Sequence, residues 1–309
     1  MVTETVARLD RIARLARLAR RLERRGLYNG AKYVRAALQR ELDRLATEDE
    51  TSGAPGRLAE DLVALAAELA ADYPAEFLER LPAIAAAAEA DEPLPLERAP
   101  ELWTCRECGE LFVGRRPGRC PVCSAPAITF AEHRPIWFLD PIDPETALLA
   151  LAAGPSRLEA ILGERPDEEL DRPPRPGEWS VRQALEHLAA AEELLGERVR
   201  RMLAEEEPDL VAVAAWAVVP ADEPRPGSLA GRTARELLER FQELREETVA
   251  LLGGLTPAEW QRTGRHPEWG RVTILSQAGY FARHEAAHVA QIAAAAEGRV
   301  PGEGRSARR

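Results

Sequence analysis

The sequence contains two groups of residue types that bind metals, one of cysteines and one of histidines. All four cysteines lie in two CxxC pairs with eleven residues between the pairs: Cys105, Cys108, Cys120 and Cys123. Thiolates at this spacing fold two turns around one tetrahedral ion. About thirty residues bury too little apolar surface to fold alone, so a metal there would supply most of the folding free energy. Free thiols or two disulfides are the disfavoured alternative.

The histidine group combines a close pair with one distant residue. His284 and His288 are four residues apart in a predicted helix, so both side chains lie on one face and can bind the same ion. His187 lies near the start of another predicted helix. Three neutral imidazoles with an open coordination position can polarise a carbonyl, activate water or hold a thiolate. Interior histidines that only satisfy hydrogen bonds show the same spacing, so the pattern alone leaves both interpretations open.

Glu285 and His266 are the candidates for moving protons at the histidine site. His266 precedes Pro267 in a predicted loop, and a surface position is the favoured interpretation. The residues from His284 to His288 also match HExxH, the zinc-protease pattern in which Glu is the general base. Such proteases usually take a third ligand from downstream, whereas the 21 residues after His288 contain no histidine and no strand pattern. We therefore disfavour a protease.

Four tryptophans are candidates to wall a cavity at the histidine site, with packing in the bundle core as the commoner fate of such side chains. They are Trp179, Trp216, Trp260 and Trp269. If apolar side chains seal the fourth coordination position, a binding or structural role is favoured. An open cavity favours catalysis.

Leucines at intervals of three and four predict amphipathic helices over 5–25, 30–48 and 58–69, with an Ala-rich helix near 75–90. These helices form a predicted N-terminal unit over residues 1–98. The first histidine of the chain is His133, so this unit cannot supply the Glu-x-x-His pairs of a di-iron bundle. We expect it to have a packing or docking role.

Helix-start signals organise the C-terminal half. N-caps and capping boxes predict helices over 143–163, 180–206, 233–252 and 274–297, with a short helix from Thr256. Four long helices here predict a four-helix bundle over 140–300 in a mainly α protein. The expected organisation is a helical unit (1–98), a four-cysteine metal domain (99–134), the bundle (140–300) and a disordered tail (301–309).

Charge and hydropathy limit the partners. Lys and Arg number 41 against 52 Asp and Glu, a net charge of −11, which disfavours nucleic acids and anionic membranes as partners. Residues 1–48 carry a local charge of +6, which we interpret as a solvated helix face. No run of eighteen apolar residues occurs, so we expect a soluble, cytoplasmic protein. Cysteines confined to two CxxC pairs agree with a reducing compartment.

The cysteine segment resembles the rubredoxin-like domain that ends rubrerythrins, over about thirty residues. The motifs are Trp103-Thr-Cys105-x-x-Cys108-Gly109, Arg119-Cys120-Pro121-x-Cys123, Pro126 and Phe130. The resemblance implies iron for electron transfer or zinc for structure, and spacing cannot choose between the metals. Ser124 stands where the second turn often has Gly, a departure that bears on its geometry. Peroxidase activity does not transfer without a di-iron bundle, and we favour a structural role.

Residues 144–297 resemble the DinB/YfiT-like superfamily. The motifs are Pro176-Gly-Glu-Trp179-Ser180-Val-Arg-Gln-x-x-x-His187, His266-Pro-Glu-Trp-Gly270 and Tyr280-x-x-His284-x-x-x-His288-x-x-Gln291. The resemblance implies a metal site of His187, His284 and His288 that holds zinc or nickel. It also implies a thiol-dependent S-transferase or metal-assisted hydrolase acting on a small-molecule thiol or an electrophile. The alternative is a non-catalytic, metal-stabilised interaction module, and paired apolar bundle faces would make a homodimer.

Overall fold

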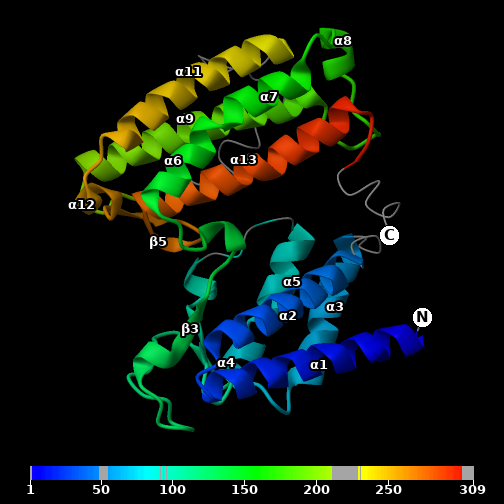
Figure 1. Ribbon diagram of the computed structural model, residues 1–309, viewed down its shortest axis with the longest axis vertical. Coiled ribbons are helices and arrows are strands. Elements are labelled where there is room, and N and C mark those ends of the chain that lie inside the picture. The colour runs from blue at the N-terminus through cyan, green and yellow to red at the C-terminus, as the bar shows by residue number, and fades with distance from the viewer. Residues whose placement is uncertain are drawn as a thin grey trace. The chain divides into compact units, whose positions relative to one another are not determined.

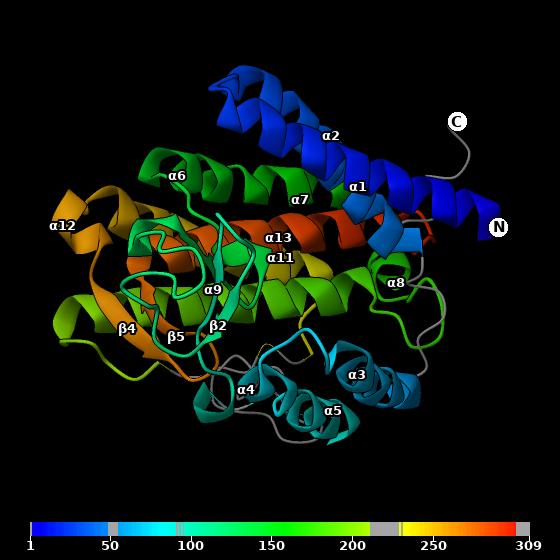
Figure 2. The same ribbon diagram turned by 90° about the horizontal axis from the view of Figure 1, so that it is seen from below.

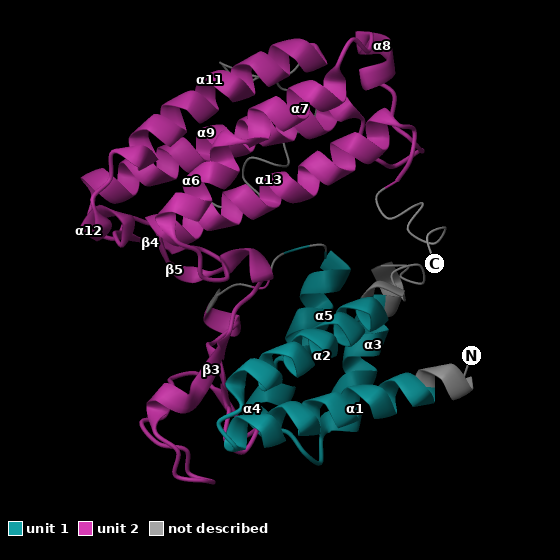
Figure 3. Ribbon diagram, in the orientation of Figure 1, with its two compact units in different colours: residues 1–92 teal, residues 93–309 magenta. Residues whose placement is uncertain are grey.

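The computed structural model describes residues 2–48, 55–90, 92, 94, 96–210, 229 and 231–300. It is mainly helical, which confirms the predicted fold class (Figure 1). The chain divides into two compact units, residues 1–92 and 93–309 (Figure 3). The predicted tail, 301–309, lies outside the described residues. In the described part of the chain, no helix combines the length and apolar character needed to cross a membrane.

The N-terminal unit consists of two pairs of packed helices. Helix α1 (Val2–Arg24) packs along α2 (Tyr28–Glu48), and α3 (Pro55–Leu69) packs against α5 (Leu81–Ala90), with α4 (Ala75–Leu78) before it. The chain turns between α1 and α2 at Gly26, whose positive φ of 73° suits glycine. The single helix predicted near 75–90 is two helices in the structure, α4 and α5.

The cysteine segment folds as a small antiparallel sheet. Its strands β1 (Leu102–Cys105), β2 (Leu111–Val113) and β3 (Phe130–His133) lie in the order β2-β1-β3. The register pairs Trp103 with Phe112 and Cys105 with Phe130. The core of this segment contains only a few apolar side chains around two buried cysteines, as expected for a segment too small to fold by apolar burial alone.

The C-terminal part is the predicted four-helix bundle. Three of its members are α9 (Val181–Ala204), α11 (Ala234–Gly253) and α13 (Ile274–Ala296). The fourth consists of α6 (Pro144–Ala152) and α7 (Gly154–Leu162), which follow one another end to end (Figures 1 and 2). Short helices α8 (Asp167–Leu170) and α12 (Pro257–Trp260) lie in the connections. The predicted capping boxes at Ser180 and Thr233 are confirmed. Each provides hydrogen-bond partners for backbone N–H groups at the start of its helix, α9 or α11.

The prediction of one continuous helix from 143 to 163 is wrong, because the chain breaks between α6 and α7. Pro155 has no N–H to donate to the carbonyl of Leu151 four residues earlier. That carbonyl accepts from a backbone N–H at the end of α6 and also from the guanidinium of Arg245, whose Nη1 lies 2.5 Å from the oxygen. Gly154 leaves room beside the break, because a Cβ there would lie 1.5 Å from Glu285 Oε1. The break is thus built around buried charged groups from α11 and α13.

A β-hairpin that the sequence did not predict precedes α13. Strands β4 (Thr263–His266) and β5 (Gly270–Thr273) pair antiparallel, with His266 opposite Gly270. The strand sequence Thr-Gly-Arg-His has little β-propensity, so periodicity gave no signal. Gly270 takes a positive φ of 71° where the chain re-enters the hairpin, which explains a glycine at that position.

Replacing Gly154 by alanine should destabilise the bundle. The new Cβ would collide with the carboxylate of Glu285, so we expect Gly154→Ala to lower the free energy of unfolding by about 1–3 kcal/mol. Urea unfolding measures the change. Gly253→Ala is the matched control, because no atom lies within 4 Å of a Cβ at that helical position. Equal stabilities of the two variants would contradict the close approach.

Candidate metal centres

The structure brings the three predicted histidines together. His187 lies in the second turn of α9, and His284 and His288 lie one turn apart on α13. The Nε2 atom of His284 is 3.1 Å from Nε2 of His187 and 3.1 Å from Nε2 of His288. One nitrogen from each ring lies within 4.8 Å of the other two. Nitrogen lone pairs at such distances need a proton or a cation between them.

The environment keeps these imidazoles neutral, which is the form that binds metals. Burial, reinforced by His288, lowers the pKa of His187 to about 4. Burial and the two neighbouring histidines lower the pKa of His284 to about 3. The pKa of His288 is also lowered by burial. Near neutral pH the rings therefore offer lone pairs.

Gln291 fixes the orientation of one ring. His288 Nδ1 lies 2.8 Å from Gln291 Oε1, and an amide oxygen only accepts, so Nδ1 carries the proton. The neutral ring then directs the lone pair of Nε2 at the other two histidines. Gln291 is one helical turn beyond His288. The spacing of three residues between His288 and Gln291 is a signal in the sequence for this contact.

Aromatic rings surround the histidines on two sides. Trp179 stacks on His288 with ring centroids 5.9 Å apart and an interplanar angle of 6°. Tyr280 stacks on His284 at 5.6 Å and 16°. Trp179 remains 39% exposed, so this edge of the histidine cluster borders solvent. The cluster is neither sealed in the core nor open on all sides.

The side chain of Glu285 is buried, and it lies away from the three facing Nε2 atoms of the histidines. Its Oε2 lies 2.5 Å from Arg245 Nη1, and its side chain is 5% exposed. The pKa of Glu285 is raised by burial, which outweighs the opposing effect of Arg245. The carboxylate is not among the donor atoms gathered at the histidines. An ion pair with arginine makes it a structural group, and this disfavours the general-base role that HExxH would assign to it.

The interpretation of His266 as a surface residue is wrong. The residue is 2% exposed, and its ring stacks on Trp269 at 3.9 Å and 7°. The turn of the β4–β5 hairpin closes over it, and Nδ1 accepts from the N–H groups of Glu268 and Trp269 at 3.2 Å each. Burial and nearby Arg198 lower the pKa of His266 to about 3. His266 is not a member of the histidine group.

The four candidate tryptophans have different surroundings. Of the three candidates that the structure describes, Trp179 alone contacts the histidine group, whereas Trp269 packs on His266 and Tyr280. Trp260 is buried in the apolar core of the bundle. Trp216 lies outside the described residues.

Comparisons with known proteins show similarity over the part of the chain that carries the three histidines. The model of the DinB superfamily matches residues 150–292, which include all three histidines. A protein of Oceanobacillus iheyensis named "Putative metal-dependent hydrolase" is 30% identical over 128 residues, 41% of this chain and 70% of the relative. The chain belongs to the DinB superfamily.

The chain is also similar to YfiT of Bacillus subtilis. "Putative metal-dependent hydrolase YfiT" of Bacillus subtilis is 28% identical to this DinB-superfamily protein over 165 residues, 52% of this chain and 88% of YfiT. A solved structure of YfiT, described as a four-helix bundle, is 26% identical, covers 52% of this chain and 89% of its own, and has a TM-score of 0.42. The match to the superfamily model begins after the cysteine segment.

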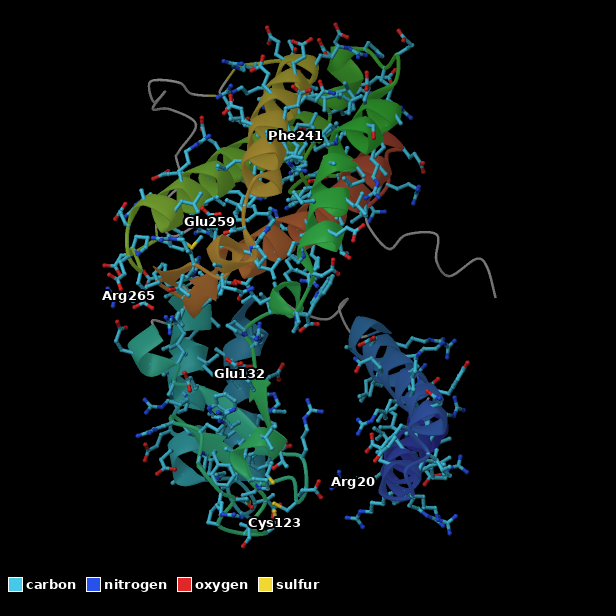
Figure 4. All side chains as sticks on the ribbon, turned by 60° about the vertical axis from the view of Figure 1, so that its left-hand side comes forward. Arg20, Cys123, Glu132, Phe241, Glu259 and Arg265 are labelled. Carbon is cyan, nitrogen blue, oxygen red and sulfur yellow. The ribbon has the colours of Figure 1, made fainter. Side chains whose placement is uncertain are left out.

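The four cysteines of this DinB-superfamily protein also converge. Cys105 Sγ is 3.6 Å from Cys123 Sγ, and Cys108 Sγ is 3.6 Å from Cys120 Sγ. One sulfur from each residue lies within 4.8 Å of the other three, and none is in a disulfide. Figure 4 shows the sulfur atoms gathered at Cys123, at the tip of the small sheet. Four sulfurs in this arrangement suit one tetrahedral ion.

The two cysteine turns have matching backbones. Gly109 and Ser124, each directly after a CxxC pair, have φ values of 87° and 63°. Gly109 N–H donates to Cys105 O at 2.8 Å, and Ser124 N–H donates to Cys120 O at 2.8 Å. Ser124 therefore adopts the left-handed conformation that glycine usually supplies, at some cost in strain. The departure from Gly does not alter the turn.

Backbone donors also favour a thiolate at the first turn. Burial alone would raise the pKa of Cys105, but N–H groups of Cys108 and Glu107 donate to its sulfur. The pKa is accordingly lowered to about 7. Thiolate is the form that binds metals.

The lowered pKa values predict acid destabilisation of the metal-free protein. Unfolded histidines take up protons as the pH falls through about 6.5, whereas His187 and His284 stay neutral down to about 4 and 3 when folded. The unfolded state then binds more protons, so stability present above pH 6.5 is lost towards pH 4. We expect a loss on the order of 1 kcal/mol per histidine between pH 7 and 5.

Urea unfolding of chelator-treated protein at several pH values measures this loss. His284→Gln should reduce the loss, since the new side chain does not titrate. His133→Gln, at an exposed position outside the cluster, is the control and should retain the full loss. The same pH dependence in His284→Gln and the wild type would contradict the assignment.

Proposed function

We propose that His187, His284 and His288 bind one divalent ion, zinc or nickel, and that the protein is a metal-assisted hydrolase. The observation that carries this proposal is the convergence of the three rings from α9 and α13, with Nε2 of His284 3.1 Å from Nε2 of each of the other two. Histidine Nε2 is a common ligand atom for both metals. The names of the relatives as metal-dependent hydrolases also support it.

The donor set fits such an ion. All three rings are held neutral by burial, and Gln291 orients the third. Because the imidazoles carry no negative charge, a bound ion would retain its full positive charge and would supply Lewis-acid activation of a water or thiol near neutral pH. The candidate ligands contributed by the described chain number three, which leaves a coordination position for an exogenous group.

The surrounding residues have their own roles in this proposal. Trp179, half-exposed beside His288, offers an apolar face to the part of a substrate that enters from solvent. Tyr280 packs against the ring of His284 and limits its rotation. Neither needs to transfer a proton.

A thiol-dependent S-transferase is the second candidate, and the uncharged ligand set favours it as well. A site with three neutral ligands suits any anionic nucleophile, and a small-molecule thiolate is one of them. The resemblance to thiol-using members of the superfamily supports the same choice. The two candidates share the histidine site and differ only in the nucleophile. If the histidine cluster were closed to both water and thiols, the non-catalytic interaction module would be favoured.

The test separates metal binding from chemistry. Metal-loaded protein is assayed on an activated ester and an activated amide without thiol, and then on an electrophile with a low-molecular-weight thiol. We expect His187→Ala and His288→Ala to lose one equivalent of metal per chain and to lower kcat/KM by at least about a thousandfold, since the ion supplies most of the activation. His133→Ala is the control. Unchanged metal content and activity in both site variants would overturn the proposal.

We also propose that Cys105, Cys108, Cys120 and Cys123 hold a separate structural zinc, with iron as the alternative. Matched left-handed turns at Gly109 and Ser124 support a closed tetrahedral site. A closed site leaves no position for substrate, so its role is to stabilise the small sheet.

The visible spectrum and Cys108→Ser test the cysteine site. A zinc protein is colourless, whereas ferric tetrathiolate is red, and the red form would replace the structural role with electron transfer. We expect Cys108→Ser to lose one equivalent of metal and the order of the sheet while retaining the metal at the histidines. Full metal content in this variant would contradict the cysteine site.

A further inference from the structure

A buried ion network connects the two helices that carry the histidines. Arg245 of α11 has a side chain that is 3% exposed. Its Nη2 donates to Glu192 Oε2 on α9 at 2.7 Å, and its Nη1 lies 2.5 Å from Glu285 Oε2 on α13. Glu192 follows His187 by five residues, and Glu285 follows His284 directly. One guanidinium thus contacts both ligand-bearing helices near their ligands.

Other contacts hold the guanidinium itself in place. Arg245 Nη1 donates to Leu151 O at the end of α6, which also accepts from a backbone N–H of the helix cap. The ring of Phe241 lies 4.7 Å from the guanidinium carbon. Because Gly154 has no side chain, the carboxylate of Glu285 can lie directly against its backbone. Four elements of the bundle, α6, α9, α11 and α13, therefore meet at this one side chain.

Stability alone is a poor explanation for this network. Burying an arginine with two carboxylates incurs a desolvation penalty that well-packed apolar residues avoid, and buried ion pairs often add little net stability. A planar guanidinium with fixed donor directions instead specifies geometry, because both carboxylates must meet it at the same time. Here that requirement fixes the rotation of α9 and of α13 about their axes.

We propose that Arg245 is a positioning residue for the histidine site. By holding Glu192 and Glu285, it sets the relative placement of α9 and α13 and so keeps the Nε2 atoms of His187 and His284 facing each other before a metal arrives. This inference rests on the proposed metal site of the previous subsection. Arg245 touches neither substrate nor metal, and it acts through the two helices.

Cobalt(II) titration of the full chain tests this role. In NMR spectra the imidazole N–H protons of cobalt ligands show large hyperfine shifts, and cysteine ligands have no such protons, so the histidine site is followed separately. Arg245→Lys keeps the charge but cannot reach both carboxylates. We expect its cobalt affinity at the histidines to fall by about 10–100-fold, with changed hyperfine shifts.

Arg240→Lys is the matched control on the same helix. Arg240 pairs with Glu193 of α9 at 3.6 Å and with Glu243 of its own helix at 3.1 Å, and its side chain is 31% exposed, against 3% for Arg245. We expect wild-type affinity and shifts in this variant. Thermal unfolding of the metal-free variants, compared before titration, separates a lost fold from a displaced site.

If Arg245→Lys does not fold, the triple variant Glu192→Leu, Arg245→Met, Glu285→Leu takes its place. An apolar replacement of the whole network should fold, since no buried charge is left unpaired. Weakened cobalt binding in a folded triple variant supports the positioning role. Wild-type affinity and shifts in either folded variant overturn it. Absence of imidazole signals in the wild type, by contrast, overturns the metal site itself.

Discussion

Nε2 of His284 lies 3.1 Å from Nε2 of His187 and 3.1 Å from Nε2 of His288, and the account of the C-terminal bundle depends on this contact. Lone pairs at that distance repel unless a positive species lies between them. Burial disfavours the charged, doubly protonated form of the rings and so lowers the pKa values of His187 and His284. The cluster is therefore a neutral, electron-rich site in a folded bundle. Such a site is best satisfied by a cation that accepts all three nitrogens.

The helices, their caps and a buried ion network hold this arrangement. A capping box at Ser180 opens α9 two turns before His187, and one at Thr233 opens α11, which carries Arg245. Arg245 then joins α9, α13 and the broken end of α6. The α6–α7 break accommodates these charged groups, because Gly154 leaves space for the carboxylate of Glu285 and Leu151 O accepts from Arg245.

Much of this architecture could be predicted from local sequence signals. N-caps and capping boxes predicted α9, α11 and α13, although not the break between α6 and α7. The spacing of four predicted that His284 and His288 share a face. That His187 joins them depends on helix packing, which no local pattern encodes. The burial of His266 was missed because the hairpin enclosing it has weak strand residues. The ion pair of Glu285 was missed because its partner Arg245 is forty residues away and looks like any charged residue of an amphipathic helix.

The most direct measurement is an anomalous-difference map from a crystal of the protein, recorded at the absorption edge of the bound metal. Our account predicts a peak at roughly 2.0–2.1 Å from Nε2 of each of His187, His284 and His288, with a non-protein ligand completing the coordination. A second peak among the four sulfurs would test the cysteine site and not the histidine site. A crystal from metal-supplemented protein with no peak at the three histidines would contradict the account.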